Sequence, residues 1–216
     1  MPISIEQKKE LAGQIIPLLK KVTPEPKTEL SFIDPFQLAC SVILAAMCTD
    51  KLVNKVTPAL FERYPDAKSL AEADIDELKT YIKSVNFFNN KAKSLIGMAR
   101  ALVTEFGSKM PQTMEELMRL PGIARKSANV ILNEAFNIAE GVVVDTHMTR
   151  VMNRLGLTEQ KDPVKIERDL MEIFDKKDWR YVSSAIVLHG RYVCVARKPK
   201  CDSCVLNKVC PSAFKV

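Results

Sequence analysis

The stretch TMEELMRLPGIARKSANVILNEAF, residues 113–136, decides the fold expected for this chain of 216 residues. Thr113 and Glu116 have the spacing of a helix capping box and predict a helix that runs to about Leu120. Pro121–Gly122 then turns the chain into a second apolar helix. A tight glycine turn that leads into a helix N-terminus presents backbone N–H groups, and such a site suits one phosphate of a nucleic-acid backbone.

Lys126 lies on the first turn of the second helix, which we expect to begin near Ala124. The positive end of the helix dipole, together with partial burial, would favour a neutral amine at this position. A neutral amine is a nucleophile that can form a Schiff base. The alternative is a charged surface lysine that reaches for phosphate beside Arg125.

The segments before and after this hairpin are also patterned for helices. IDPFQLACSVILAAMC, residues 33–48, opens with Asp34 as N-cap and Pro35 at the first helical position. Its apolar residues cover every face for about 13 residues, so we expect a buried central helix that is too short to span a bilayer.

Other helix boundaries are expected from local signals. Ser69 and Glu72 have the spacing of a capping box, Asp162–Pro163 opens a helix, and Gly190 is placed to end the helix before the last cysteines. About ten short helices result, and no segment alternates convincingly with period 2. The expected class is all-α.

Asp145 precedes the helical pattern of VVVDTHMTRVMNRLGL, residues 142–157, and is expected to cap that helix. An aspartate at this position is usually a cap and nothing more. The helix dipole, however, also stabilises an ionised carboxylate, which a reaction that builds positive charge on a sugar ring would require.

The positive charge is concentrated near the C-terminus. The net charge is +6, and the segment Arg191–Val216 holds six Lys and Arg residues against one Asp. Such a patch favours DNA or RNA first and an anionic membrane second, with plain solvated surface as the alternative. Because no apolar run reaches a membrane span and the N-terminus lacks a signal-peptide pattern, we expect a cytoplasmic protein, nucleoid-associated in a prokaryote.

Four cysteines lie close together near the C-terminus in the spacing C-x6-C-x2-C-x5-C: Cys194, Cys201, Cys204 and Cys210. A disulfide framework is unexpected in an intracellular chain of this size, so the pattern indicates a metal site. Zinc and a [4Fe–4S] cluster both accept four thiolates, and the single close pair favours the cluster. Cys40 and Cys48 lie in the apolar segment and are expected to be small buried residues.

The loop between the first two of these cysteines carries three cations, Arg197, Lys198 and Lys200. Because metal ligands would fix both ends of the loop, these cations would bind phosphates with little further loss of conformational entropy.

The hairpin, the Asp145 segment and HGRYVCVARKPKCDSCVLNKVC (residues 189–210), in this order, resemble the endonuclease III family of helix-hairpin-helix DNA glycosylases. The resemblance extends from Thr28 to Cys210. It implies two helical domains on either side of a DNA-binding cleft: residues 28–138 as a six-helix domain with the hairpin, and residues 1–27 plus 139–216 as the iron–sulfur cluster domain.

The resemblance also implies the roles of individual residues. Lys126 would attack C1′ of the damaged nucleotide, Asp145 would assist departure of the base, and the four cysteines would hold a [4Fe–4S] cluster. The resulting iminium would eliminate the 3′ phosphate and nick the strand. The residues expected to contact DNA are Met47, Phe87, Gly122, Ile123, Ala124, Arg125, Thr146, His147, Arg197, Lys198 and Lys200.

Three positions depart from the family pattern. The family places a Gln and a Leu in the gap that a flipped base leaves, whereas the matching residues here are Met47 and Phe87. Met47 cannot form an amide's hydrogen bonds to the orphaned base, but Phe87 can still act as a wedge. Without the resemblance, both would be interpreted as core residues. Ala124 replaces the usual second glycine of the hairpin, which should matter little if that residue is already helical.

The expected function is a glycosylase and abasic-site lyase that removes oxidised pyrimidines. Its partner would be double-stranded DNA with damaged bases or abasic sites, it would act as a monomer, and no membrane is involved. A non-catalytic or weakly active damage-binding paralogue remains an alternative, and so does a thymine or uracil mismatch glycosylase of the same superfamily.

Overall fold

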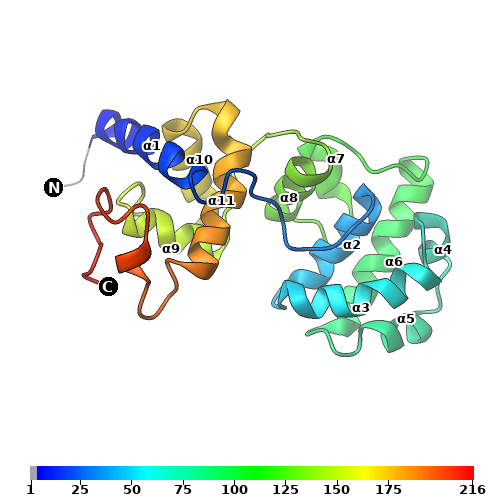
Figure 1. Ribbon diagram of the computed structural model, residues 1–216. Helices are drawn as coiled ribbons and strands as arrows, with labels where there is room; N and C mark the ends of the chain where they lie inside the picture. Colours follow the sequence, from blue (N-terminus) through cyan, green and yellow to red (C-terminus); the bar gives the residue numbers. More distant parts are fainter. Residues whose placement is uncertain (1–3) are drawn as a thin grey trace. The chain divides into compact units, whose positions relative to one another are not determined.

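The computed structural model describes residues 4–216 (Figure 1). The first three residues of the expected cluster domain lie outside the described residues. The chain divides into two compact units, Glu29–Ile138 and the combination of the N-terminal segment through Thr28 with Ala139–Val216. Every regular element in residues 4–216 is a helix, which confirms the all-α class. None of these helices is long and apolar enough to cross a membrane.

The unit Glu29–Ile138 is built around one buried helix. The helices are α2 (Pro35–Ala45), α3 (Asp50–Arg63), α4 (Ala67–Ala71), α5 (Ile75–Ile82), α6 (Phe88–Glu105), α7 (Met114–Arg119) and α8 (Arg125–Ala135). As its apolar pattern predicts, α2 is buried on nearly all sides and packs against α3, α6 and α8. The long helix α6 packs on α4 and α5, so α2 and α6 together carry the core.

The second unit is formed by both ends of the chain (Figure 1). Its helices are α1 (Ile5–Lys20), α9 (Thr146–Arg154), α10 (Pro163–Ile173) and α11 (Trp179–Tyr192), with short 3₁₀ helices at Lys176–Asp178 and Cys201–Ser203. α9 packs on α11, and α1 packs on α10. Leu19, Met152 and Ile186 are fully or almost fully buried in the core that these helices share.

Most predicted helix starts are confirmed. The carboxylates of Asp34, Asp145 and Asp162 each accept the backbone N–H three residues further on, at 2.8, 2.8 and 3.0 Å. Thr113 caps α7 in the same way, through the N–H of Glu116 at 3.3 Å. These caps are fixed by residues within one turn, which explains why the sequence alone locates them.

Two predicted boundaries are wrong. Ser69 does not begin a helix, because α4 already starts at Ala67 with Asp66 as its cap, and Ser69 is the third residue of that capping box. Gly190 does not end a helix but lies inside α11, where an added Cβ would come within 2.9 Å of the His147 Cβ. This glycine therefore allows α9 and α11 to pack closely.

Candidate nucleic-acid interface and metal centre

The predicted hairpin is present, with α7 and α8 joined by a short turn. Gly122 has φ +84°, and a Cβ there would lie 2.8 Å from the Ser94 Cβ and 3.3 Å from Ile43 Cδ1. Pro121 also packs closely on α6, since a Cβ added to Gly97 would lie 3.1 Å from the Cβ of Pro121. The turn is therefore seated on α6 and α2, and glycine is required at position 122 for both its φ angle and its small size.

At the turn of the hairpin the Ile123 N–H already donates to the Leu120 carbonyl at 3.1 Å, so the backbone N–H groups of interest are those at the N-terminus of α8. Ile123 is buried, so its side chain anchors the turn to the core. Ala124 is the N-cap of α8 with φ −95° and ψ 170°, and it has no side-chain oxygen to cap the helix. The helix thus begins next to Ala124, as expected, and although Ala124 itself is not helical, its negative φ explains why glycine is not needed there. An N-terminus without a side-chain cap is suited to an anion.

Lys126 is the second residue of α8 and its side chain is exposed. The expectation that the Lys126 side chain is partly buried is therefore wrong within its own unit, Glu29–Ile138. Within residues 4–216, no hydrogen bond or ion pair engages the Lys126 amine. The side chain projects from the same first turn whose backbone suits a phosphate, so an amine and an anion site lie next to each other.

Met47 and Phe87 are the large apolar side chains that the sequence pattern alone assigns to a core. The structure places both on the surface, with 77% and 66% of their area exposed. Both also adopt left-handed backbone conformations, with φ 57° and 58°. The core interpretation is therefore wrong, and two apolar side chains are available for contact with a partner.

Asp145 is half-buried at the N-terminus of α9, where its Oδ1 accepts the Met148 N–H. The strand-like segment before it is held in place, because Val144 is buried and the Val143 N–H donates to Ser183 Oγ of α11 at 3.0 Å. Thr146 is exposed and His147 half-buried on the first turn of α9. The carboxylate is thus fixed by its own helix.

Two arginines of α9, which the sequence patterns did not single out, connect this helix to the first cysteine. Arg150 donates through Nη2 to the Gly190 carbonyl at 2.6 Å and through Nε to the Cys194 carbonyl at 3.0 Å. Arg154 donates to the Cys194 sulfur at 3.3 Å. Their spacing of four residues, which puts two bases on one helix face, is the signal that could have identified them.

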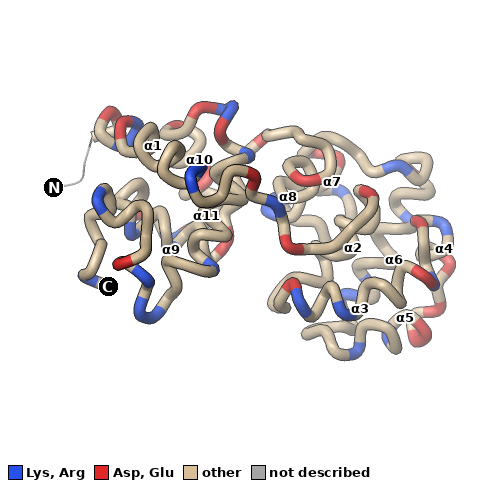
Figure 2. Tube along the Cα trace, viewed as in Figure 1, with Lys and Arg blue, Asp and Glu red and all other residues tan. Residues whose placement is uncertain are grey.

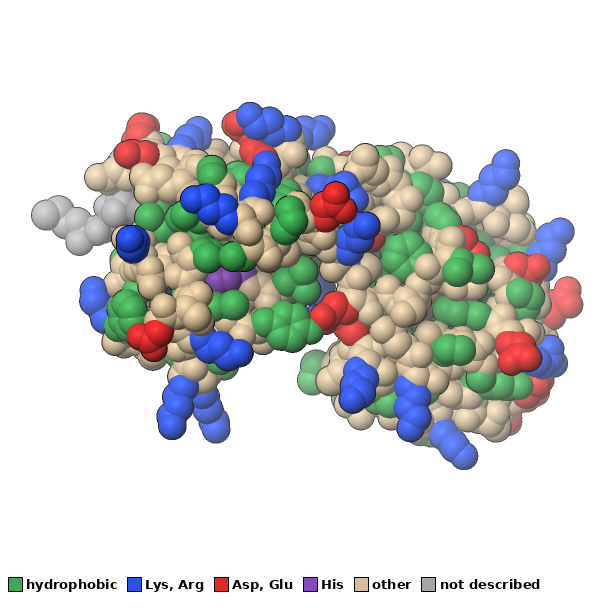
Figure 3. Space-filling model, in the orientation of Figure 1, with side chains coloured by type: hydrophobic (Ala, Val, Ile, Leu, Met, Phe, Trp, Pro, Cys, Tyr) green, Lys and Arg blue, Asp and Glu red, His purple; other side chains and the backbone are tan. Residues whose placement is uncertain are grey.

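The basic loop between Cys194 and Cys201 exposes all three of its cations, Arg197, Lys198 and Lys200. Figure 2 shows Lys and Arg at the tip of this loop, and in Figure 3 basic side chains extend from the surface there. Lys198 has φ 54°, and the Lys200 N–H donates to the Val193 carbonyl at 3.0 Å, which closes the loop. The cations are therefore displayed on a loop of fixed shape.

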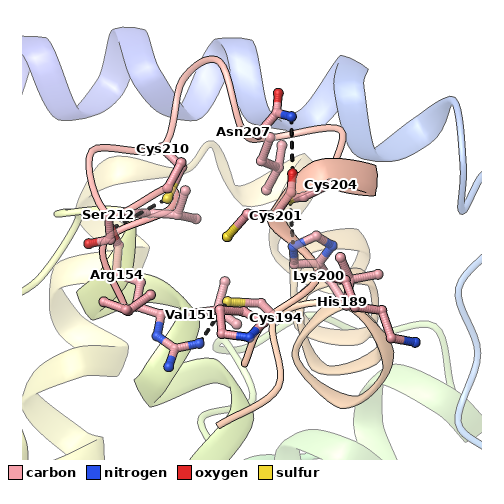
Figure 4. Close-up of a pocket in the computed structure, with 16 residues that line it drawn as sticks. Val151, Arg154, His189, Cys194, Lys200, Cys201, Cys204, Asn207, Cys210 and Ser212 are labelled. Atoms are coloured by element: carbon pink, nitrogen blue, oxygen red, sulfur yellow. Dashed lines mark hydrogen bonds between the residues drawn. The ribbon is translucent and has the colours of Figure 1, made fainter. Parts of the chain in front are cut away.

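The four C-terminal cysteines border one pocket, which is lined on its remaining sides mainly by apolar residues, among them Val151 of α9, Val193 and Leu206. In Figure 4 the sulfurs of Cys194, Cys201 and Cys210 face the same space. Burial raises the pKa of the Cys204 and Cys210 thiols. A metal bound here would replace the thiol protons, since thiolates are the ligating form.

The four thiols form a donor set for a metal group at this pocket. Zinc would require four sulfurs about 2.3 Å from one point, whereas a [4Fe–4S] cube holds each thiolate on a separate iron. Free thiols around an apolar pocket are therefore a suitable donor set for the cluster.

His189 of α11 lies next to this set. Burial lowers its pKa to about 4, so the ring is neutral near pH 7. Its Nε2 lies 3.6 Å from the Cys204 sulfur. The thiol region therefore has close polar neighbours from both α9 and α11.

Comparisons with known proteins agree with this arrangement. Residues 40–176 match the model of the HhH-GPD superfamily of base excision DNA repair proteins, and residues 194–210 match the iron–sulfur binding domain of endonuclease III. Endonuclease III of Synechocystis sp. is 52% identical over 95% of this chain and 94% of its own length.

Solved structures give the same result. A non-covalent endonuclease III–DNA complex has a TM-score of 0.89 at 35% identity, covering 95% of this chain and 96% of that one. A trapped endonuclease III–DNA covalent intermediate has a TM-score of 0.88 at 34% identity, covering 98% and 97%. The chain therefore belongs to the endonuclease III family, as a base-excision DNA glycosylase and lyase that carries a [4Fe–4S] cluster.

Proposed function

We propose that this enzyme removes oxidised pyrimidines from double-stranded DNA through a Schiff base on Lys126, and then nicks the strand 3′ to the abasic site. The observation that carries the proposal is the exposed Lys126 amine on the first turn of α8, next to a turn whose backbone suits a phosphate. A structural relative solved as a covalent DNA intermediate supports an enzyme-bound nucleophile.

Lys126 acts first, as the nucleophile. Its neutral amine attacks C1′ of the damaged nucleotide, and the bond from C1′ to the base breaks with the electron pair leaving on the base. The sugar ring then opens to a protonated Schiff base. Loss of a proton from C2′ drives cleavage of the C3′–O bond, so the 3′ phosphate leaves, and hydrolysis of the Schiff base releases Lys126.

Asp145 acts by charge. Its ionised carboxylate stabilises the positive charge that develops on the sugar as the base departs. Its hydrogen bond from the Met148 N–H holds the carboxylate at the N-terminus of α9. The rigid segment before α9 keeps the carboxylate in one orientation.

DNA binding is divided between two surfaces, both of which bind without preference for base sequence. In the unit Glu29–Ile138, the hairpin residues Gly122, Ile123, Ala124 and Arg125 bind a phosphate mainly through their backbone, while Met47 and Phe87 enter the duplex. In the other unit, Thr146 and His147 lie beside Asp145, and Arg197, Lys198 and Lys200 bind further phosphates. Because a base inside a duplex cannot be reached, the damaged nucleotide is turned out of the stack before it reacts.

Cys194, Cys201, Cys204 and Cys210 would hold the [4Fe–4S] cluster, and as ligands Cys194 and Cys201 would fix the two ends of the basic loop. The functional domains are then residues 28–138, with the hairpin, and residues 1–27 plus 139–216, with the cluster. The enzyme acts as a monomer on duplexes that contain damaged bases or abasic sites. The donor set, the exposed cations and the family match over residues 194–210 support the assignment of the cluster to this segment.

Borohydride trapping tests the nucleophile. Wild-type protein incubated with a thymine-glycol duplex and borohydride should give a covalent adduct, because reduction fixes the Schiff base. Lys126→Gln should give no adduct, whereas Lys93→Gln, which changes an exposed lysine of α6, should give as much as wild type. An adduct with Lys126→Gln equal to that of wild type would show that another amine is the nucleophile.

A further inference from the structure

Two turns of the unit Glu29–Ile138 hold exposed apolar residues in strained conformations. Met47 lies between α2 and α3, and Phe87 is the N-cap of α6. Both are left-handed, which costs free energy in any residue with a Cβ. Because these side chains are mostly exposed, burial cannot repay that cost, and some other part of the structure must hold the two turns in shape.

Asn86 joins the two turns directly. Its Nδ2 donates to the Met47 carbonyl at 2.8 Å, and its backbone N–H donates to the Cys48 sulfur at 3.3 Å. The residue immediately before Phe87 is thus bonded to Met47 and to the residue after it. The two turns therefore cannot move independently while these bonds are intact.

Lys91, a buried residue of α6, holds the turn that contains Met47 through a second set of bonds. Only 6% of its area is exposed, and its Nζ donates to the carbonyls of Leu44 at 2.8 Å and Ala46 at 2.6 Å. It also lies 3.5 Å from the Cys48 sulfur. α2 ends at Ala45, so these carbonyls belong to a helix end that lacks further intrahelical donors. The buried Lys91 of α6 donates hydrogen bonds to these two carbonyls and so connects the end of α2 to the start of α6.

We propose that Asn86 and Lys91 are positioning residues that hold Met47 and Phe87 as one preformed apolar edge, which fills the duplex when a damaged nucleotide is turned out. The inference rests on the proposed function, because it requires a base to leave the stack. Apolar side chains that enter a base step must offset the cost of unstacking it. An edge that is already ordered loses less conformational entropy on binding, so more of its contact energy remains for opening the duplex.

Base opening can be measured separately from chemistry with a fluorescent base. In a duplex with thymine glycol opposite 2-aminopurine, the 2-aminopurine signal rises when that base loses its stacking. Asn86→Ala should slow this rise and the single-turnover excision rate about fivefold, the effect of one lost hydrogen bond. The control Asn90→Ala, at an exposed residue of the next turn, should change neither rate.

The buried lysine needs its own pair of variants. Lys91→Met should slow opening at least about fivefold, because the carbonyls of Leu44 and Ala46 both lose their donor. Lys91→Arg should restore part of the rate, and Lys93→Met, which removes the same charge from an exposed site on α6, should leave it unchanged. If Lys91→Met and Lys93→Met slow opening equally, the effect is one of net charge and the positioning role is wrong.

A double-mutant cycle separates positioning from a general loss of structure. In a Met47→Ala/Phe87→Ala background there is no apolar edge left to position, so adding Asn86→Ala should change the opening rate less than about twofold. The same fivefold loss in both backgrounds would contradict the inference, since Asn86 would then act independently of the two side chains.

A second substrate distinguishes failure of this inference from failure of the proposed function. At a preformed abasic site no base pair has to be opened, so Asn86→Ala should nick it at close to the wild-type rate. Normal nicking by all variants, together with equal excision by Asn86→Ala and Asn90→Ala, would overturn the positioning role and leave the proposed function intact. Absence of both reactions in wild type would overturn the two together.

Discussion

Arg154 donates a hydrogen bond of 3.3 Å to the sulfur of Cys194, the first residue of the cysteine set. The same guanidinium donates to the carbonyls of Val195 and Ala196 at 2.8 and 2.9 Å. One side chain of α9 therefore supports both a thiol and the first residues of the basic loop. Three bonds from one charged group are a strong local restraint, since bonds to charged groups each contribute about 1.5–3 kcal/mol.

Removing this restraint should weaken cluster retention. We expect Arg154→Met to lose iron to a chelator about tenfold faster than wild type, because the Cys194 end of the loop is no longer held. Loss of visible absorbance under anaerobic conditions measures the rate. Arg168→Met, at an exposed arginine of α10 in the same unit, is the control and should behave as wild type. Equal rates for the two variants would exclude a role of Arg154 in retention.

Gly122→Ala should be more destabilising than an ordinary change at a left-handed glycine. Both Gly122 and Gly107 have positive φ, but only Gly122 has neighbours within 4 Å of an added Cβ. The left-handed conformation alone costs about 1–2 kcal/mol with a Cβ. In urea unfolding, Gly107→Ala should therefore lower the free energy of unfolding by about that amount. Gly122→Ala should lower it by more and should also bind DNA more weakly.

The steric part of this loss can be isolated. Ser94 is the nearest neighbour, at 2.8 Å, so Ser94→Gly should recover stability in the Gly122→Ala protein while the cost of the φ angle remains. If the second change recovers nothing, the contact between the turn and α6 is not the cause.

The basic loop should govern how DNA affinity depends on salt. Each phosphate contact contributes about 0.9 to the slope of log K against log salt for duplex DNA. Replacing Arg197, Lys198 and Lys200 with Ala should therefore lower the slope by about 2 to 3, as measured by fluorescence anisotropy over a salt series. A control with Ala at the exposed residues Lys9, Lys161 and Lys165 removes the same charge and should leave most of the slope. Equal slopes for the two triple variants would mean that net charge alone matters.

Tyr181 predicts a loss of stability at high pH. Burial raises the pKa of its hydroxyl to about 12, and that hydroxyl donates to the Thr23 carbonyl at 2.9 Å. Its pKa in the unfolded chain is about 10, so between about pH 10 and 12 the folded state keeps a proton that the unfolded state has lost. The resulting stability is complete below about pH 10 and is lost as the pH rises toward about 12.

Thermal midpoints across this range test the titration. Tyr181→Phe should flatten the decline, whereas Tyr192→Phe, at an exposed tyrosine of the same helix, should keep it. An unchanged decline in Tyr181→Phe would assign it to another group.

The sequence predicts what one or two turns of helix determine, and it fails where distant elements meet. Asp34 and Asp162 cap their helices through bonds three residues away, so their roles are visible locally. Gly190 was misassigned because its role depends on His147, more than one helix away in the chain. Ser69 was misassigned because Asp66, just before it, is the cap that forms.

The candidate site shows the same division. The cysteine spacing and the Pro121–Gly122 turn are local patterns, and they predicted a metal site and a helical hairpin. The apolar pattern assigned Met47 and Phe87 to a core, and only the family resemblance pointed to DNA. Asn86 and Lys91 were missed altogether, because the bonds that define their roles cross 38 to 47 residues of sequence. A signal that could have identified Lys91 is its place one helical turn before Leu95, on the buried side of α6.

Asp145 offers a test that separates a structural role from a chemical one. Asp and Asn are about equally good N-caps, so Asp145→Asn should keep the bond to the Met148 N–H and change the free energy of unfolding by less than about 1 kcal/mol. The variant loses the negative charge, however, and a lost electrostatic contribution to the transition state commonly costs a factor of about 10² to 10³ in rate. Single-turnover excision of thymine glycol measures this loss. Asp162→Asn, the same change at the N-cap of α10, is the matched control and should excise at the wild-type rate. Equal rates for the two variants, with unchanged stability, would show that Asp145 acts as a helix cap and does not contribute its charge to the reaction.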